Sequence, residues 1–383
     1  MSWKIMAFSA YKSFTIVFIL VVCLFVTISK IIFDEVYKES RIVIDEAFHI
    51  PQGLEYCRLN FKFWDPKITT LPGLYIISAV ILSPFNACSD YWLKFISFTA
   101  TFVNYILLFA ILQVNNRHDK WKNLFLATNL SLLPPLLFFG NLYYTDTVSI
   151  TFILLMILLF KIEYIILASV IALFSVIMRQ TNIIWVAMLF AHLCLVELYT
   201  AVTKKKQVDL SFSDIKLLMQ QLQQRKLDVK KVPKSIWCNI LSFLAVCLSF
   251  VVFIITNKGI VVGDKSAHVM TFHFVQILYF LLFCLIFTWP YFISSVLPFL
   301  YLVQQRKVFS LLIISFMGVV VLLNTEVHPY LLADNRHYTF YIWNRFYQND
   351  VFRYLIIPAY YFGGYCFFRC RMLENNLKAV YNY

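Results

Sequence analysis

Apolar runs about as long as a bilayer is thick recur along this sequence, and they constrain its fold more than any other feature. About 20 consecutive apolar residues cross the hydrocarbon core of a membrane as an α-helix. The first run extends from Thr15 to Phe33. It is too long for the apolar region of a signal peptide and lacks a small-residue cleavage site, so we expect it to remain as an anchor. The sequence therefore predicts an all-α polytopic membrane protein.

The composition leaves little room for a water-soluble domain. Hydrophobic residues make up 61% of the 383 residues and charged residues only 14%, whereas about a quarter of a soluble domain is charged. The mean hydropathy is +0.74. We find no internal repeat and no low-complexity tract. A single transmembrane domain over residues 1–383 is therefore expected.

The nine cysteines are scattered, with no C-x-x-C pair and no spacing typical of metal ligands. Neither a zinc site nor a disulfide scaffold is therefore indicated. Most of these cysteines are expected to lie in spans as small apolar residues. Cys57 and Cys88 could pair if both face an oxidising compartment.

A net charge of +13 is compatible with binding to nucleic acid, but the positions of the charges argue against such a partner. Basic residues collect in short loops, which is the signature of cytosolic segments in membrane proteins. The longest polar stretch, residues 200–235, is therefore predicted to be a cytosolic basic loop. The other basic segments are the N-terminus, residues 117–122, residues 306–307 and the tail with Arg369 and Arg371.

Counting crossings between these loops predicts about 10–11 transmembrane helices. Ten full spans are expected, at residues 15–33, 92–113, 122–141, 146–161, 163–178, 183–199, 236–256, 272–303, 308–325 and 351–368. The apolar run at 72–85 is shorter and is assigned to an interfacial or re-entrant segment. The run at 272–303 is long for one span, so we expect a kink at Pro290 or a strong tilt.

The predicted topology places compact groups of ionisable residues on the non-cytosolic side. The segments on that side are 34–91, 143–146, 179–182, 257–271 and 326–350. Ionisable groups near a membrane core are costly and usually mark a functional site. Because the loop charges alone fixed the orientation, the gathering of these groups on one face predicts a single active site there.

The ionisable residues of the non-cytosolic segments could have structural roles as well as catalytic ones. Charges just outside a span can be solvated caps, and Lys67, Arg345 and Arg353 could extend towards lipid headgroups. Asp45 and Glu46 could cap an amphipathic interfacial helix over residues 47–56. Such a cap is compatible with catalysis because it holds the carboxylate in place. His49 is expected to be structural rather than catalytic.

Six motifs in these segments resemble the dolichyl-phosphate-glucose-dependent alpha-1,2-glucosyltransferases. The motifs lie at residues 45–52, 64–75, 143–146, 179–182, 262–268 and 328–340, and the resemblance extends from near residue 40 to about 362. It departs at one point. Members of that family usually continue with further spans and a motif of the kind Leu-Leu-Glu-Phe-Arg-Tyr-Phe, and nothing like it follows Tyr365. A shortened form of the enzyme, with an incomplete lipid groove, and a truncated gene model are both open at this point.

The resemblance implies a C-type glycosyltransferase fold with a luminal catalytic loop, residues 34–91, in the endoplasmic reticulum membrane. The donor would be dolichyl phosphate glucose, and the acceptor the diglucosylated, dolichyl-pyrophosphate-linked oligosaccharide. Inversion from a beta-linked donor to an alpha product requires one in-line displacement assisted by a general base. Asp45 is expected to be that base, with Glu46 as the second candidate, since neighbouring residues on a helix point about 100° apart.

The leaving phosphate would require cationic partners. The candidates are Arg179, Lys265, His268, Arg336 and His337, with Arg336 the strongest because a planar guanidinium suits a phosphate. Residues expected to bind the acceptor or sugar are Trp64, Asp65, Asp146 and Asp334. No Asp-x-Asp motif occurs, so neither a metal nor another cofactor is expected. The aromatic residues of this face could stack on sugars or form a membrane-interface belt.

Two other functional classes stay open on the residues alone. A transporter of a lipid or organic anion should carry ionisable groups near the bilayer midplane and show related halves. A membrane scaffold that regulates a partner should tolerate Asp45→Asn without effect. The placement of charge at one surface and the lack of a repeat favour an enzyme.

Overall fold

The computed structural model describes residues 2–40, 42–43, 45–203, 210, 212–224, 234–265, 273–327 and 338–381. These residues form helices, turns and bends, without a strand among them. They separate into two compact units, Met1–Ser266 and Ala267–Tyr383. The all-helical prediction is confirmed. The two units are groups of helices that contact one another closely. This division does not test whether the chain is a single transmembrane domain, which stays a prediction.

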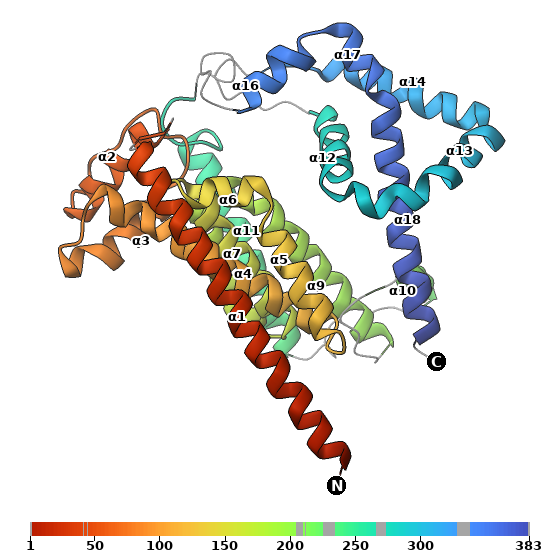
Figure 1. Cartoon of the computed structure of the whole chain (residues 1–383), viewed down its shortest axis with the longest axis horizontal. Helices are drawn as coiled ribbons and strands as arrows, with labels where there is room; N and C mark the ends of the chain where they lie inside the picture. Colours follow the sequence, from red (N-terminus) through yellow and green to blue (C-terminus); the bar gives the residue numbers. More distant parts are fainter. Residues whose placement is uncertain are drawn as a thin grey trace. The chain divides into compact units, whose positions relative to one another are not determined.

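The first unit is a helical bundle with a layer of short helices and loops, the cap, at one end (Figure 1). Its helices are α1 (Ser2–Glu39), α2 (Glu46–Cys57), α3 (Gly73–Leu82), α4 (Asp90–Asn115), α5 (Lys120–Ser131), α6 (Pro134–Gly140), α7 (Thr145–Lys161), α8 (Ile165–Met178), α9 (Ile183–Thr203), α10 (Phe212–Gln224) and α11 (Lys234–Asn257). The helices α2 and α3 lie at the end of α1 opposite the N-terminus. The loop predicted to follow the first span is therefore a small helical layer over the bundle.

The second unit begins with a broken helix. Its helices are α12 (Val275–Phe292), α13 (Val296–Gln305), α14 (Lys307–Asn324), α16 (Tyr338–Ile342), a π-helical turn (Trp343–Tyr347), α17 (Asp350–Leu355) and α18 (Ile357–Tyr381). A 3₁₀ turn at Ile293–Ser295 separates α12 from α13, just after Pro290. Proline removes a backbone donor and disturbs the helix around it. The expected kink at Pro290 or strong tilt stays a prediction, and the 3₁₀ turn lies close to that proline within a single 31-residue candidate span, Val275–Gln305.

Six of the described helices are long and apolar enough to cross a membrane, and a seventh crossing results if α5 and α6 form one bent span. This number is lower than the ten full spans predicted. The helices α7 and α8 have only 17 and 14 residues, and the second half of α18 carries charged residues. The run at 122–141 bends by 63° between α5 and α6, where the first residue of α6 is Pro134. The short run at 72–85 forms α3 and a 3₁₀ turn.

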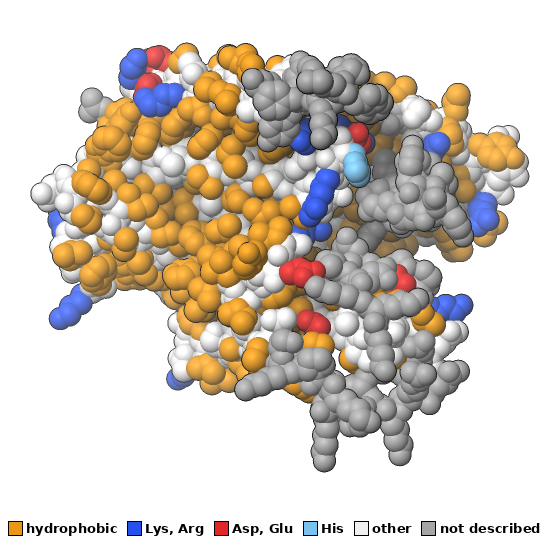
Figure 2. Space-filling model, turned by 90° about the horizontal axis from the view of Figure 1, so that it is seen from below, with side chains coloured by type: hydrophobic (Ala, Val, Ile, Leu, Met, Phe, Trp, Pro, Cys, Tyr) orange, Lys and Arg blue, Asp and Glu red, His pale blue; other side chains and the backbone are white. Residues whose placement is uncertain are grey.

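The surface of the molecule is consistent with a lipid environment. Apolar side chains cover much of the face seen in Figure 2. On α1, Ile16, Leu20, Leu24 and Ile31 are all exposed, although large contiguous apolar patches are uncommon on water-soluble monomers. The chain is therefore a multi-pass membrane protein.

Candidate functional site

Four of the five polar segments predicted on one face meet at the cap of the first unit. The start of α2 contacts the start of α7 through a hydrogen bond of 2.8 Å from the backbone N–H of Asp45 to the hydroxyl of Tyr144. The side-chain amide of Gln180 donates to the carbonyl of Thr69 at 2.7 Å. The backbone N–H of Asp264 donates to the carbonyl of Pro66 at 2.7 Å. The fifth segment, 326–350, belongs to the second unit, and its residues 328–337 lie outside the described residues.

The neighbouring carboxylates Asp45 and Glu46 have opposite environments. Glu46 is fully buried and accepts hydrogen bonds from the backbone N–H groups of Val43 (2.9 Å) and Tyr143 (2.6 Å) and from Lys94 Nζ (2.8 Å). Asp45 is exposed and occupies the N-cap position of α2, but its side chain makes no capping hydrogen bond. Because successive helical residues point about 100° apart, anchoring Glu46 inwards turns Asp45 outwards.

His49 lies one turn along α2 from Asp45 and is buried between two tyrosines. Its Nδ1 is 2.5 Å from the hydroxyl of Tyr75, and its ring packs against that of Tyr144. Burial, together with the positive charge of Arg179, lowers the pKa of His49 to about 4, although the charge of Asp65 acts in the opposite direction. The imidazole is therefore neutral near pH 7, which agrees with the structural role expected for it.

The Trp64–Lys67 segment is held against α2 by one glutamine. The side chain of Gln52 donates to the carbonyl of Phe63 at 2.8 Å and accepts from the backbone N–H of Asp65 at 2.9 Å. The ammonium group of Lys67 lies 4.7 Å from the centroid of the Phe48 ring. The indole N–H of Trp64 is buried without a hydrogen-bond partner in the structure. This donor is available to a ligand oxygen if one enters the cap.

Gly263 brings the loop after α11 into contact with the same segment. Its φ is +68°, and a Cβ at this position would lie 2.4 Å from the carbonyl oxygens of both Pro66 and Ile68. Left-handed backbone favours glycine, and no side chain can approach two backbone oxygens so closely. The glycine is therefore what allows residues 262–264 to reach the loop between α2 and α3.

We expect Gly263→Ala to destabilise the cap by about 1–3 kcal/mol, the cost of a strained backbone, because the loop must move away from Pro66. The measurement is the thermal stability of the purified full chain in detergent. Gly318→Ala is the matched control, since the nearest atom to its added Cβ would be 3.8 Å away. Equal stability of the two variants would contradict the close approach.

Two of the predicted cationic residues lie at this cap. The guanidinium of Arg179, at the end of α8, forms an ion pair with the carboxylate of Asp146 in the first turn of α7. Both side chains are about one-third exposed, at 34% and 30%. Lys265 is exposed and donates to the carbonyl of Asn257. His268, Asp334, Arg336 and His337 lie outside the described residues.

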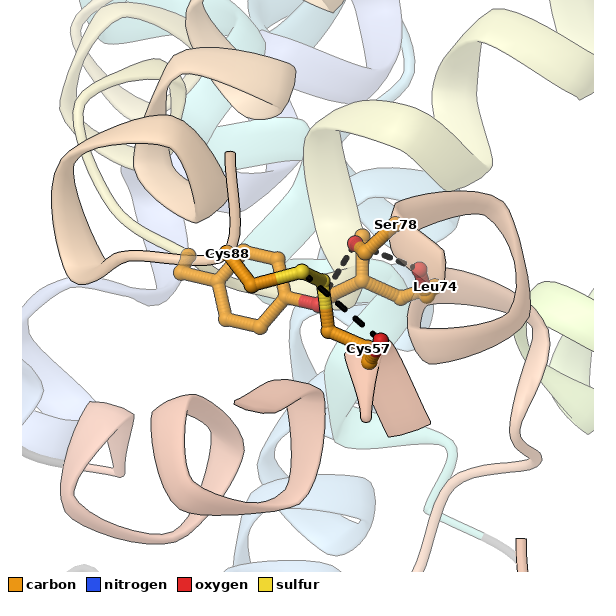
Figure 3. The surroundings of a disulfide bond; sticks show 5 residues. Cys57, Leu74, Ser78 and Cys88 are labelled. Carbon is orange, nitrogen blue, oxygen red and sulfur yellow. Dashed lines mark hydrogen bonds between the residues drawn. A yellow bond between two sulfur atoms is a disulfide. The ribbon is translucent and has the colours of Figure 1, made fainter. Parts of the chain in front are cut away.

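A disulfide closes the segment that carries α2 and α3. Cys57, the last residue of α2, pairs with Cys88, just before α4 (Figure 3). Ser78 lies beside this bridge and donates to the carbonyl of Leu74 at 2.8 Å. Disulfides persist in oxidising compartments, so this bond agrees with the non-cytosolic position predicted for residues 34–91. No cluster of three or more metal-ligating side chains occurs among the described residues.

Sequence reasoning missed several residues that build the site. Lys94 lies within the apolar run predicted at 92–113, and a charge inside such a run is itself a signal of function. Gln52 and Gln180 were quoted only as parts of motifs, and nothing in their spacing indicates which carbonyls they bind. Apart from its place in the motif at 143–146, nothing in the sequence indicates that Tyr144 contributes to the site.

Comparisons with known proteins agree with the resemblance noted in the motifs. Residues 39–382 match the model of the DIE2/ALG10 family. A Drosophila melanogaster protein named Dol-P-Glc:Glc(2)Man(9)GlcNAc(2)-PP-Dol alpha-1,2-glucosyltransferase is 42% identical over 350 residues, which cover 88% of this chain and 76% of that protein. Proteins of the same name from Rattus norvegicus and Arabidopsis thaliana are 35% and 31% identical, covering 84% of this chain and 73% and 76% of their own lengths.

No solved structure matches the chain. The family model extends over both compact units and over all six motifs. The relatives extend the match to insects, mammals and plants. This chain is a member of the DIE2/ALG10 family.

Proposed function

We propose that this chain is an inverting glucosyltransferase of the endoplasmic reticulum membrane. It transfers glucose from dolichyl phosphate glucose, in alpha-1,2 linkage, to the diglucosylated lipid-linked oligosaccharide, the last step in assembly of the precursor for protein N-glycosylation. The observation that carries this proposal is the 42% identity to a relative of that name, and four of the five polar segments of this chain meet at one cap. The active site faces the lumen.

Asp45 is the proposed general base. The reaction needs a carboxylate that can reach the acceptor 2-hydroxyl and take its proton during attack on the glucose carbon. Asp45 is exposed at the start of α2, whereas the oxygens of Glu46 are engaged by three donors. The environments of the two residues therefore favour Asp45 as the base and a supporting role for Glu46.

The leaving phosphate gains charge as the bond to glucose breaks, and cationic groups stabilise that charge. Arg179 and Lys265 are the proposed partners among the described residues, together with His268, Arg336 and His337. Asp146 pairs with Arg179, so its proposed role shifts from sugar binding to orienting the guanidinium. Trp64, Asp65 and Asp334 remain the proposed acceptor or sugar contacts.

Removing a phosphate partner should weaken donor use more than turnover. We expect Arg179→Ala and Arg336→Ala each to raise the donor KM by about tenfold or more, since charge-assisted hydrogen bonds contribute about 1.5–3 kcal/mol. Arg306→Ala, in a loop predicted to be cytosolic, is the matched control. Initial rates are measured in microsomes at varied dolichyl phosphate glucose. An unchanged donor dependence in either variant would remove that arginine from the donor site.

The size of the lipid-linked glycan tests the function itself. Cells that lack this protein should accumulate an oligosaccharide one glucose short of the full glycan, and expression of the full chain should restore the complete one. A complete glycan in the deficient cells would contradict the proposal. Restoration by an Asp45→Asn variant would instead favour the transporter or scaffold, because neither requires a base.

A further inference from the structure

One buried lysine at the cap takes part in no step of the proposed reaction. Lys94 is the fifth residue of α4, and its Nζ lies 2.8 Å from Oε2 of Glu46, 48 residues earlier in the chain. Both side chains are fully buried. The same ammonium group lies 5.9 Å from the centroid of the Tyr37 ring. Lys94 is therefore shielded from solvent and cannot contact a phosphate directly.

Stability alone does not account for a buried pair of opposite charges. Desolvation of the two groups opposes their attraction, and apolar side chains of similar volume often serve as well or better. A buried pair does, however, impose a defined geometry on the segments it joins, because its hydrogen bonds are directional. The segment joined to α4 by this pair is the one that carries Asp45.

Glu46 transmits that geometry to Asp45 through the backbone. Its Oε2 accepts from both Lys94 Nζ and the N–H of Val43, and its Oε1 accepts from the N–H of Tyr143. The backbone two residues before Asp45 is thus bound to the carboxylate of the residue that follows it. The N–H of Asp45 itself is bound by the hydroxyl of Tyr144. Among these described contacts, Tyr143 and Tyr144 join the backbone around the proposed base to the start of α7, and Lys94 joins it to α4.

We infer that Lys94 is a positioning residue, which holds the carboxylate of Asp45 in the direction of attack through its ion pair with Glu46. This inference rests on the proposed function. Donor binding depends on the other cationic residues, so loss of the pair lowers turnover without changing the donor KM. A displacement of about 1 Å at a reacting group can reduce the rate by about 100-fold.

The main test is the double variant Glu46→Gln/Lys94→Met, which leaves no unpaired buried charge and keeps one oxygen for the N–H of Tyr143 but none for that of Val43. The single variant Lys94→Met would leave Glu46 charged and unpaired, and loss of folding could hide its effect. Full-length variants are expressed in cells lacking the enzyme. Turnover in their microsomes is divided by the amount of protein with an intact Cys57–Cys88 bond, measured by maleimide labelling.

We expect the double variant to lose about 10- to 100-fold in kcat, with the donor KM within about twofold of wild type. Lys94→Arg should keep kcat within about threefold because it retains the charge. Lys30→Met, which breaks an ion pair with Asp34 on α1, is the matched control and should match wild type. Wild-type kcat in the double variant would overturn the positioning role alone. Absence of transfer by the wild-type chain would overturn the proposed function.

Discussion

Asp45→Asn should abolish glucose transfer while leaving the amount of folded protein unchanged. The substitution keeps the size of the side chain but removes its capacity to accept a proton, and loss of a general base reduces rates by about 10²–10⁴-fold. Because Asp45 is exposed and asparagine keeps its size and one side-chain oxygen, we expect the fold to tolerate the change. Transfer is measured in microsomes with dolichyl phosphate glucose and the diglucosylated acceptor.

Asp119→Asn is the matched control for this substitution. Asp119 precedes α5 and lies beyond the opposite end of α4 from Lys94, so its loss should leave transfer within about twofold of wild type, as is usual for surface changes. Protein amount and Cys57–Cys88 bonding are compared in parallel. Retained transfer by Asp45→Asn at a normal protein level would remove Asp45 from the role of base.

Glu46→Gln should have the opposite phenotype and deplete the folded protein. It leaves Lys94 buried opposite a neutral amide, and breaking one side of a buried ion pair destabilises a protein by about 3–5 kcal/mol. That is a large share of the stability of a typical domain. The measurement is the thermal stability of the solubilised full chain, together with its steady-state level in membranes.

Two conservative substitutions at adjacent positions are thus expected to separate chemistry from folding. The contrast is stronger than either result alone, because Asp45→Asn and Glu46→Gln each replace one carboxylate with its amide. If Glu46→Gln were as stable as wild type and lacked transfer, while Asp45→Asn retained it, the assignment of the two carboxylates would be reversed.

The helical membrane architecture could be predicted because long apolar runs have few alternatives in a bilayer. The gathering of polar motifs could also be predicted. Basic loops indicate which side of the membrane is cytosolic, and this orientation determines which loops lie together on the other side. The number of membrane spans is harder to predict from the sequence. Bends such as that before Pro134, and short paired helices such as α7 and α8, cannot be told from full spans by hydropathy alone.

The contrast between exposed Asp45 and buried Glu46 could not be predicted from the sequence. Adjacent carboxylates look equivalent there, and the difference arises only when a lysine 48 residues away reaches one of them. The Cys57–Cys88 pair was one open alternative, because spacing does not give connectivity. The role of Gly263 likewise depends on a backbone approach that no local pattern reveals.

The reach of Gly263 back to the loop between α2 and α3 has a consequence for the order in which the site forms during synthesis. Glu46 can pair with Lys94 as soon as the start of α4 has been synthesised, and with the N–H of Tyr143 just before α7 is synthesised. The hydrogen bond from Gln180 to Thr69 can form only after α8 has been synthesised. The contact between Asp264 and Pro66 must await the completion of α11. The loop between α2 and α3 therefore gains its described contacts one after another during synthesis, and the described part of the candidate site is complete only after α11.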